Sequence, residues 1–154
     1  MTGVQTCALP IVAWLGYGGL LPFLALTLAS AGDVHHRLVW SEVLVGYGAV
    51  ILSFVGALHW AFAMLGNGLD AATRRATYLW SVVPALLAWP ATWLATSTAC
   101  IVLGLGFVAH LLQDRRLARS LELPAWYLPL RCRLTVVATL ALSATALLSS
   151  ASWQ

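Results

Sequence analysis

The stretch EVLVGYGAVILSFVGALHWAFAML, residues Glu42–Leu65, decides the class of this protein. It holds a single charged side chain, Glu42, in its first position. About 20 apolar residues are enough for a helix to cross the hydrocarbon core of a bilayer, at about 1.5 Å per residue. Ser41 is a suitable N-cap, and the breaker Gly66-Asn67-Gly68 follows. The stretch therefore predicts a transmembrane helix over residues 42–65.

The composition of the whole chain agrees with this reading. Of its 154 residues, 61% are hydrophobic and 8% are charged, and the mean hydropathy is +0.88. A water-soluble domain carries about 25% charged residues, so this chain cannot cover a water-facing surface. The net charge of +3 is too small to indicate nucleic acid. We expect the lipid bilayer to be the main partner, with any protein partner unknown.

Four more apolar stretches have lengths close to that of a membrane span. They cover residues 11–30, 78–95, 99–113 and 133–150. The sequence thus predicts an all-α fold, a polytopic membrane helical bundle of about five transmembrane helices in one domain over residues 11–150. The stretches 78–95 and 99–113 could instead form a re-entrant hairpin, because the second of them is short for a span.

The first ten residues, MTGVQTCALP, are set apart from this bundle. They resemble a translated sequencing adapter and lack the basic start of a signal peptide. We therefore expect residues 1–10 to be an adapter-derived or disordered leader.

The distribution of arginine predicts the orientation. The loops over residues 66–77 and 114–132, with the start of the last helix, carry seven arginines, whereas the other two loops carry Arg37 alone. Arginine and lysine favour the cytoplasmic side, so these two loops are expected in the cytoplasm and the C-terminus in the periplasm. The absence of lysine and the abundance of alanine, leucine and tryptophan suggest a bacterial gene, and hence the bacterial inner membrane.

Two histidines are expected at membrane depth, His59 and His110. Ionisable groups there are costly and are functional candidates by default. Two imidazoles at similar depth could relay protons, ligate haem iron, or simply form hydrogen bonds to neighbouring helices. No third ligand stands at metal spacing, so we expect no metal and no other cofactor. Catalytic motifs are also missing, which favours a non-enzymatic protein.

The segment before the last predicted helix contains WYLPLR, residues 126–131. Its proline-interrupted pattern predicts an elbow rather than a continuous helix. Trp126 and Tyr127 are suited to headgroup depth, and Arg131 and Arg133 to contact with anionic lipid phosphates. We therefore expect these four residues at the lipid interface.

Small residues recur every fourth position in the helix over residues 42–65. Ala49, Ser53 and Ala57 form a narrow stripe. Such stripes allow close helix contact in lipid, so we expect this face to pack inside the bundle.

Several strings together resemble a known family. They are YGAVILSFVGALHW (Tyr47–Trp60), YLWSVVPALLAWP (Tyr78–Pro90), GFVAHLLQDRRL (Gly106–Leu117) and LPAWYLPLRCRLT (Leu123–Thr135). The chain is similar, from about residue 20 to 147, to the transmembrane protein 69-like family, also called domain of unknown function 3429. The resemblance implies a small multi-pass membrane protein, bacterial or mitochondrial, and implies no reaction, cofactor or catalytic residue. In ALHWAF, Ala57 and Ala61 stand where we expect glycines in this family.

Three functions remain as hypotheses. The first is a non-enzymatic protein with a structural, assembly or partner-binding role. The second is a proton-coupled small-solute carrier or channel that uses an intramembrane histidine. The third is a haem-binding electron carrier that uses His59 and His110.

Overall fold

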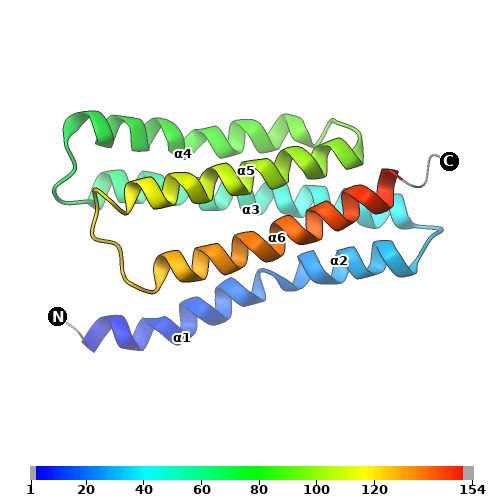
Figure 1. Cartoon of the computed structure of the whole chain (residues 1–154), viewed down its shortest axis with the longest axis horizontal. Helices are drawn as coiled ribbons and strands as arrows, with labels where there is room; N and C mark the ends of the chain where they lie inside the picture. Colours follow the sequence, from blue (N-terminus) through cyan, green and yellow to red (C-terminus); the bar gives the residue numbers. More distant parts are fainter. Residues whose placement is uncertain (1–2, 151–154) are drawn as a thin grey trace.

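The computed structural model describes residues 3–150 of the chain, and the side chains of residues 11–150. Within that part, every regular element is an α-helix. The helices are α1 (Gly3–Gly18), α2 (Leu21–Gly32), α3 (Arg37–Leu65), α4 (Ala71–Ala91), α5 (Thr96–Leu117) and α6 (Tyr127–Ser150). They lie side by side, with α1 and α2 end to end along one edge and α4 at the opposite edge (Figure 1). The predicted all-α bundle is confirmed.

The bundle has the surface of a membrane protein. Four stretches of the described residues, Ile11–Gly32, α3, α5 and α6, are long and apolar enough to cross a membrane. The fifth long helix, α4, has 21 residues and packs against α3 and α5, but it carries two arginines near its start. Apolar side chains at the middle of the helices point outward, since Phe54, Leu105 and Leu140 are each 64% exposed. A continuous apolar exterior of this kind requires lipid around it, so the chain is a multi-pass membrane protein.

The break between α1 and α2 divides the first predicted helix. Residues 19–20 form a turn, because a cluster of glycines precedes Pro22, which occupies the first turn of α2. The Tyr47 hydroxyl of α3 donates to the carbonyl oxygen of Gly19 at 2.8 Å, which satisfies a backbone group that the turn leaves free. Residues 3–10, which were expected to belong to a separate leader, form the first part of α1 in the structure.

The predicted start of the helix over residues 42–65, which is α3 in the structure, is wrong by five residues. α3 begins at Arg37, where the guanidinium Nε donates to the carbonyl oxygen of Ser30 at 3.0 Å and so satisfies the end of α2. Ser41, predicted as the N-cap, is instead buried within α3. Its hydroxyl lies 3.2 Å from that of Ser30 and accepts from Ser149 of α6 at 3.2 Å. The three hydroxyls connect α2, α3 and α6.

The helix α4 also starts earlier than predicted, at Ala71 rather than residue 78. Asp70 is its N-cap, and the carboxylate accepts from the backbone N–H groups of Ala72 and Thr73 at 3.1 and 3.2 Å. Arg74 then reaches back and donates to the carbonyl oxygens of Ala63 and Gly66, at the C-terminus of α3. The charged residues that suggested a loop here are therefore the caps of two helices.

The polar segment between the last two helices is much shorter than predicted. α5 runs to Leu117 instead of residue 113, and two arginines in its last turn suit the negative end of the helix dipole. α6 begins at Tyr127 instead of residue 133. Pro129 stands in the first turn of α6, where its missing N–H breaks no helical hydrogen bond. As a result, Asp114 and Arg131 both lie on helices.

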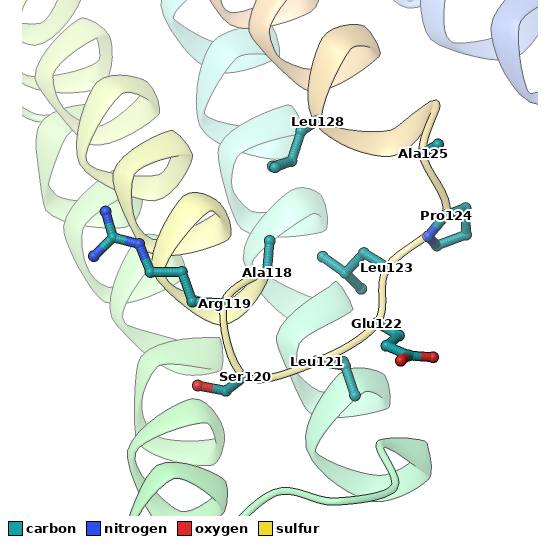
Figure 2. Close-up of a pocket in the computed structure, with 9 residues that line it drawn as sticks. All are labelled: Ala118, Arg119, Ser120, Leu121, Glu122, Leu123, Pro124, Ala125 and Leu128. Atoms are coloured by element: carbon teal, nitrogen blue, oxygen red, sulfur yellow. The ribbon is translucent and has the colours of Figure 1, made fainter.

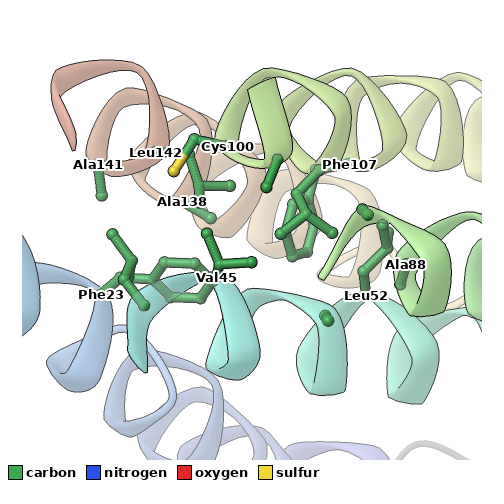
Figure 3. Close-up of a cluster of buried hydrophobic side chains, with 14 of the residues drawn as sticks. Phe23, Val45, Leu52, Ala88, Cys100, Phe107, Ala138, Ala141 and Leu142 are labelled. Carbon is green, nitrogen blue, oxygen red and sulfur yellow. The ribbon is translucent and has the colours of Figure 1, made fainter. Parts of the chain in front are cut away.

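The core lies where α2, α3, α5 and α6 meet, with Ala88 contributed by α4 (Figure 3). Phe23 of α2, 1% exposed, is in edge-to-face contact with Tyr47 and Phe107 at ring-centroid distances of 5.2 and 6.0 Å. The helices approach most closely at glycines. A Cβ at Gly56 would lie 2.8 Å from the ring of Pro84, and one at Gly106 only 2.6 Å from Leu52.

The predicted packing stripe of α3 is only partly correct. Ala49 is buried, but Ala57 is exposed. The face that packs inside the bundle carries Gly48, Leu52 and Gly56, all buried. Small residues do provide the close contact, on a face rotated from the one that the sequence suggested.

Candidate polar cluster in the bundle

Five buried polar side chains from three helices meet at one end of the bundle. They are His59 of α3, His110 and Asp114 of α5, and Tyr127 and Arg131 of α6. His110 and Asp114 are four residues apart, as are Tyr127 and Arg131, so each pair shares one helix face. We call these five residues the polar cluster.

Asp114 is the centre of the polar cluster. Its Oδ2 accepts from Arg131 Nε at 2.9 Å, and its Oδ1 accepts from the Tyr127 hydroxyl at 3.2 Å. Nε2 of His59 and Nε2 of His110 lie 3.6 and 3.8 Å from the same Oδ1. With neutral histidines, the charges of Asp114 and Arg131 balance each other in the low-dielectric interior, where an unpaired charge is expensive.

Trp80 of α4 fixes the protonation state of His110. Its indole Nε1–H, which can only donate, lies 3.1 Å from His110 Nδ1. The two rings are nearly parallel, with centroids 6.5 Å apart and an interplanar angle of 11°. Nδ1 must therefore be the accepting nitrogen, which leaves the proton of the neutral ring on Nε2, facing Asp114.

His59 is held differently. Its side chain is fully buried, and neither Nδ1 nor Nε2 has a hydrogen-bond partner among the described residues. The ring is positioned by edge-to-face contacts with His110 and Phe62, at centroid distances of 4.7 and 5.8 Å. His59 therefore points into the bundle beside His110, but its two ring nitrogens have no hydrogen-bond partner among the described residues. Buried groups left unpaired in this way are rare and call for an explanation.

A third ligand atom accompanies the two histidines, contrary to the expectation from sequence. Ligand atoms of His59, His110 and Asp114 lie within 4.8 Å of one another. Nitrogen and oxygen atoms around a tetrahedral zinc ion, each about 2.0–2.1 Å from it, would lie roughly 3.3 Å apart, so the spacing is close to that of a metal site. The donor set fits less well. Trp80 keeps the proton of His110 on Nε2, the atom that would bind, and Arg131 already neutralises the carboxylate.

The same geometry bears on haem binding. His59 and His110 touch each other directly, with centroids 4.7 Å apart and rings inclined at 65°. Ligation of one iron from both sides would require the two rings to lie on opposite faces of a porphyrin. Contacting rings leave no space for that plane.

The four residues expected at the lipid interface divide into two groups. Tyr127 and Arg131 lie in the bundle, 7% exposed each, with Asp114 as their shared partner. Trp126 is half-buried just before α6. Arg133 points to the other face of α6, where it donates to the Tyr17 hydroxyl at 3.3 Å. For Tyr127 and Arg131 this placement corrects the expectation.

The spacing of four residues in the sequence indicates part of this cluster. His110 and Asp114 stand at the i and i+4 positions of a helix, as do Tyr127 and Arg131. The apolar run ends before Asp114 and therefore predicts a loop there, which conceals the pairing of Asp114 with His110. Nothing in the sequence shows that α5 and α6 bring the two pairs together.

A separate hollow of about 400 Å³ lies at the loop between α5 and α6. Figure 2 shows that its lining comes from this loop and from Leu128 in the first turn of α6. The charged side chains Arg119 and Glu122 point away from each other in the figure. The hollow therefore has no convergent charged pair, and we assign it no function.

Comparison with known proteins agrees with the resemblance noted in the sequence. The family model described as "Protein of unknown function (DUF3429)" matches residues 9–147. Transmembrane protein 69 of Xenopus tropicalis is 34% identical over 143 residues, which cover 89% of this chain and 54% of that protein. The chain thus spans about half the length of this relative. No solved structure is detectably similar. The chain belongs to the DUF3429 family of membrane proteins of unknown function.

Proposed function

We propose that this chain is a non-enzymatic membrane protein whose polar cluster binds and releases a proton at His59, as the proton site of a small proton-coupled carrier or channel. The observation that carries the proposal is the state of the His59 ring. It is fully buried, neither nitrogen has a hydrogen-bond partner within the part of the chain that the structure describes, and Nε2 lies 3.6 Å from the Asp114 carboxylate. Histidine is the side chain whose ordinary charge change falls closest to physiological pH.

Proton binding at His59 would change the pairing of Asp114. A neutral imidazole has one nitrogen free to accept a proton, and the resulting imidazolium has two N–H donors. It would then compete with Arg131 for the one carboxylate between them. If the Asp114 carboxylate exchanged its ion pair with Arg131 for one with His59, the link between α5 and α6 would weaken and a new link between α5 and α3 would form. The proton would thereby be coupled to helix packing.

The neighbours of His59 on each packed helix bear on this exchange. α5 presents His110 and Asp114, α6 presents Tyr127 and Arg131, and α4 contributes only the uncharged Trp80, through its contact with His110. Burial of the ring opposes a proton on His59, and so does the charge of Arg131, whereas Asp114, the single acid among these neighbours, favours one. Whether His59 binds a proton therefore depends on the position of Arg131.

Proton uptake by the purified protein tests the proposal. We expect His59→Gln to bind one proton fewer per chain than the wild type when the pH is lowered over the range in which both remain folded. His35→Gln is the matched control, because it removes a histidine from the exposed turn between α2 and α3, outside the polar cluster. Equal proton uptake by the wild type and His59→Gln would overturn the proposal.

A structural or partner-binding role is the second candidate. It is favoured by the two direct bonds from α6 to Asp114, those of Tyr127 and Arg131, because such links hold helices together in lipid. In that case, His59 would serve packing alone. The proton-uptake experiment separates the candidates, because a purely structural His59 stays neutral throughout.

We further propose that the chain lies in a bacterial inner membrane, with the 66–70 and 118–126 loops in the cytoplasm and the C-terminus in the periplasm. The arginine asymmetry supports this orientation. Both loops lie at the end of the bundle where α1 begins, opposite the end where α6 finishes (Figure 1). A C-terminal alkaline phosphatase fusion should be active and a green fluorescent protein fusion dark. The reverse pattern would refute the orientation.

A further inference from the structure

A groove of about 490 Å³ runs between α1, α3 and α6. Its volume falls within the range of about 300–1,000 Å³ that ligand pockets occupy. The walls are almost entirely apolar, with Leu15 from α1, Phe54 and Phe62 from α3, and Leu130 and Leu134 from α6. An apolar groove of this size suits a hydrocarbon chain.

One wall of the groove also carries unsatisfied polar groups. Arg131 and Thr135 both line it, and they are 7% and 3% exposed. Arg131 uses its Nε on Asp114, but its Nη2 has no partner among the described residues, and neither has the Thr135 hydroxyl. Two buried donors without acceptors on one wall indicate a ligand that brings oxygen acceptors.

The charge of the polar cluster restricts the head of that ligand. Asp114 already balances Arg131 at 2.9 Å, so a second carboxylate would place excess negative charge in a low-dielectric site. A neutral carbonyl oxygen satisfies both donors without this cost. The ligand is therefore expected to present an ester-like carbonyl rather than a free acid at this point.

The depth of the two donors agrees with this chemistry. Arg131 and Thr135 stand four and eight residues after the first residue of α6, which is about 6 and 12 Å along the helix. The polar layer of a bilayer is roughly 5–7 Å thick on each side. With the start of α6 at the membrane surface, Arg131 lies at the inner edge of that layer, where the glycerol esters of phospholipids are found, and Thr135 lies about one helical turn deeper, on the side of the acyl chains.

We infer that the groove binds one diacyl phospholipid, with an ester carbonyl on Arg131 and Thr135 and an acyl chain between α1, α3 and α6. The inference goes beyond the proposed proton site and does not depend on it. The bound lipid would be distinct from the lipids that surround any membrane protein, because a single site saturates at one molecule per chain.

Native mass spectrometry with phosphatidylethanolamine tests this inference, using Thr135→Val and Thr139→Val as a matched pair. Both threonines lie on α6 with buried hydroxyls that have no hydrogen-bond partner among residues 11–150, but of the two Thr135 alone lines the groove. We expect one retained lipid per chain in the wild type. Thr135→Val should weaken its binding about two- to tenfold, the equivalent of one hydrogen bond, and Thr139→Val should leave it unchanged. Melting temperatures show whether both variants remain folded.

Several outcomes would overturn the inference. Equal binding by the two threonine variants, or lipid binding that does not saturate at one molecule, would leave only the surrounding lipid shell. One-to-one binding of oleic acid or of an isoprenoid quinone, in place of the phospholipid, would contradict the assigned ligand. His59→Gln at constant pH should retain the lipid, so failure here is distinguishable from failure of the proton site.

Discussion

Replacement of Asp114 by asparagine would show how strongly the polar cluster stabilises the bundle. The substitution preserves shape, and one amide oxygen can still accept from the Tyr127 hydroxyl. It removes the charge that balances Arg131, whose Nε lies 2.9 Å from the carboxylate in a site where the two side chains are 8% and 0% exposed. An uncompensated buried charge costs about 3–5 kcal/mol, and we expect Arg131 at the low end of that range, because it stands in the second turn of α6, near the membrane surface.

We therefore expect Asp114→Asn to lower the free energy of unfolding by about 3 kcal/mol. Removal of both charges in Asp114→Asn/Arg131→Met should cost less than the single change, because no buried charge is left alone. Steric trapping in lipid-detergent micelles measures the free energy of unfolding of the single and the double variant. Glu42→Gln, which removes an exposed acid from α3, is the control and should stay within about 0.5 kcal/mol. A change that small for Asp114→Asn, or additive losses in the double variant, would refute the reasoning.

Two further predictions concern helix contacts and helix ends. Gly56→Ala should destabilise the bundle by about 1–3 kcal/mol, because its Cβ would meet the rigid ring of Pro84 at 2.8 Å. Gly46→Ala should stabilise the bundle by about 0.5–1 kcal/mol, because a Cβ there meets no described atom within 4 Å. Equal shifts of the melting temperature in the two variants would contradict this prediction. Hydrogen bonds from Thr73 hold the pKa of Asp70 below its ordinary value of 3.8. The contribution of the Asp70 carboxylate to the stability of the folded protein is therefore complete above that value, and it is lost as the pH falls through the lower pKa of the folded state. Asp70→Asn should keep the cap but remove this acid dependence, which melting curves between about pH 2 and pH 6 measure; an unchanged acid dependence would argue against it.

The hydropathy pattern was sufficient for the kind of fold and for five apolar stretches, but not for the break between α1 and α2 or for the helix ends. Apolar runs mark the part of each helix that lies in hydrocarbon, and α3 and α5 extend past it into charged residues. Asp70 and Arg74 read as loop residues because they are charged, yet they cap α4 and α3. The boundary of an apolar run is set by the membrane, whereas the boundary of a helix is set by its caps.

The candidate site was predicted in part, for a similar reason. His59 and His110 stand out because histidine is rare in apolar helices. Arg131 was expected to contact lipid phosphates, since WYLPLR suggests an interfacial elbow, but the early start of α6 turns this side chain onto Asp114. Which helices are neighbours depends on packing at Gly56 and Gly106, and no local pattern reveals it.

The proposed function requires His59 to take up a proton beside Asp114. The most direct measurement is the ¹⁵N spectrum of histidine-labelled protein in lipid bilayers as a function of pH, with His59 assigned through His59→Gln. We predict that the two ring nitrogens of His59 change from the unequal shifts of a neutral ring to the similar shifts of an imidazolium while the protein stays folded. His110 should remain a neutral ring protonated on Nε2, as its contact with Trp80 requires. A His59 ring that stays neutral until the bundle unfolds would contradict the account.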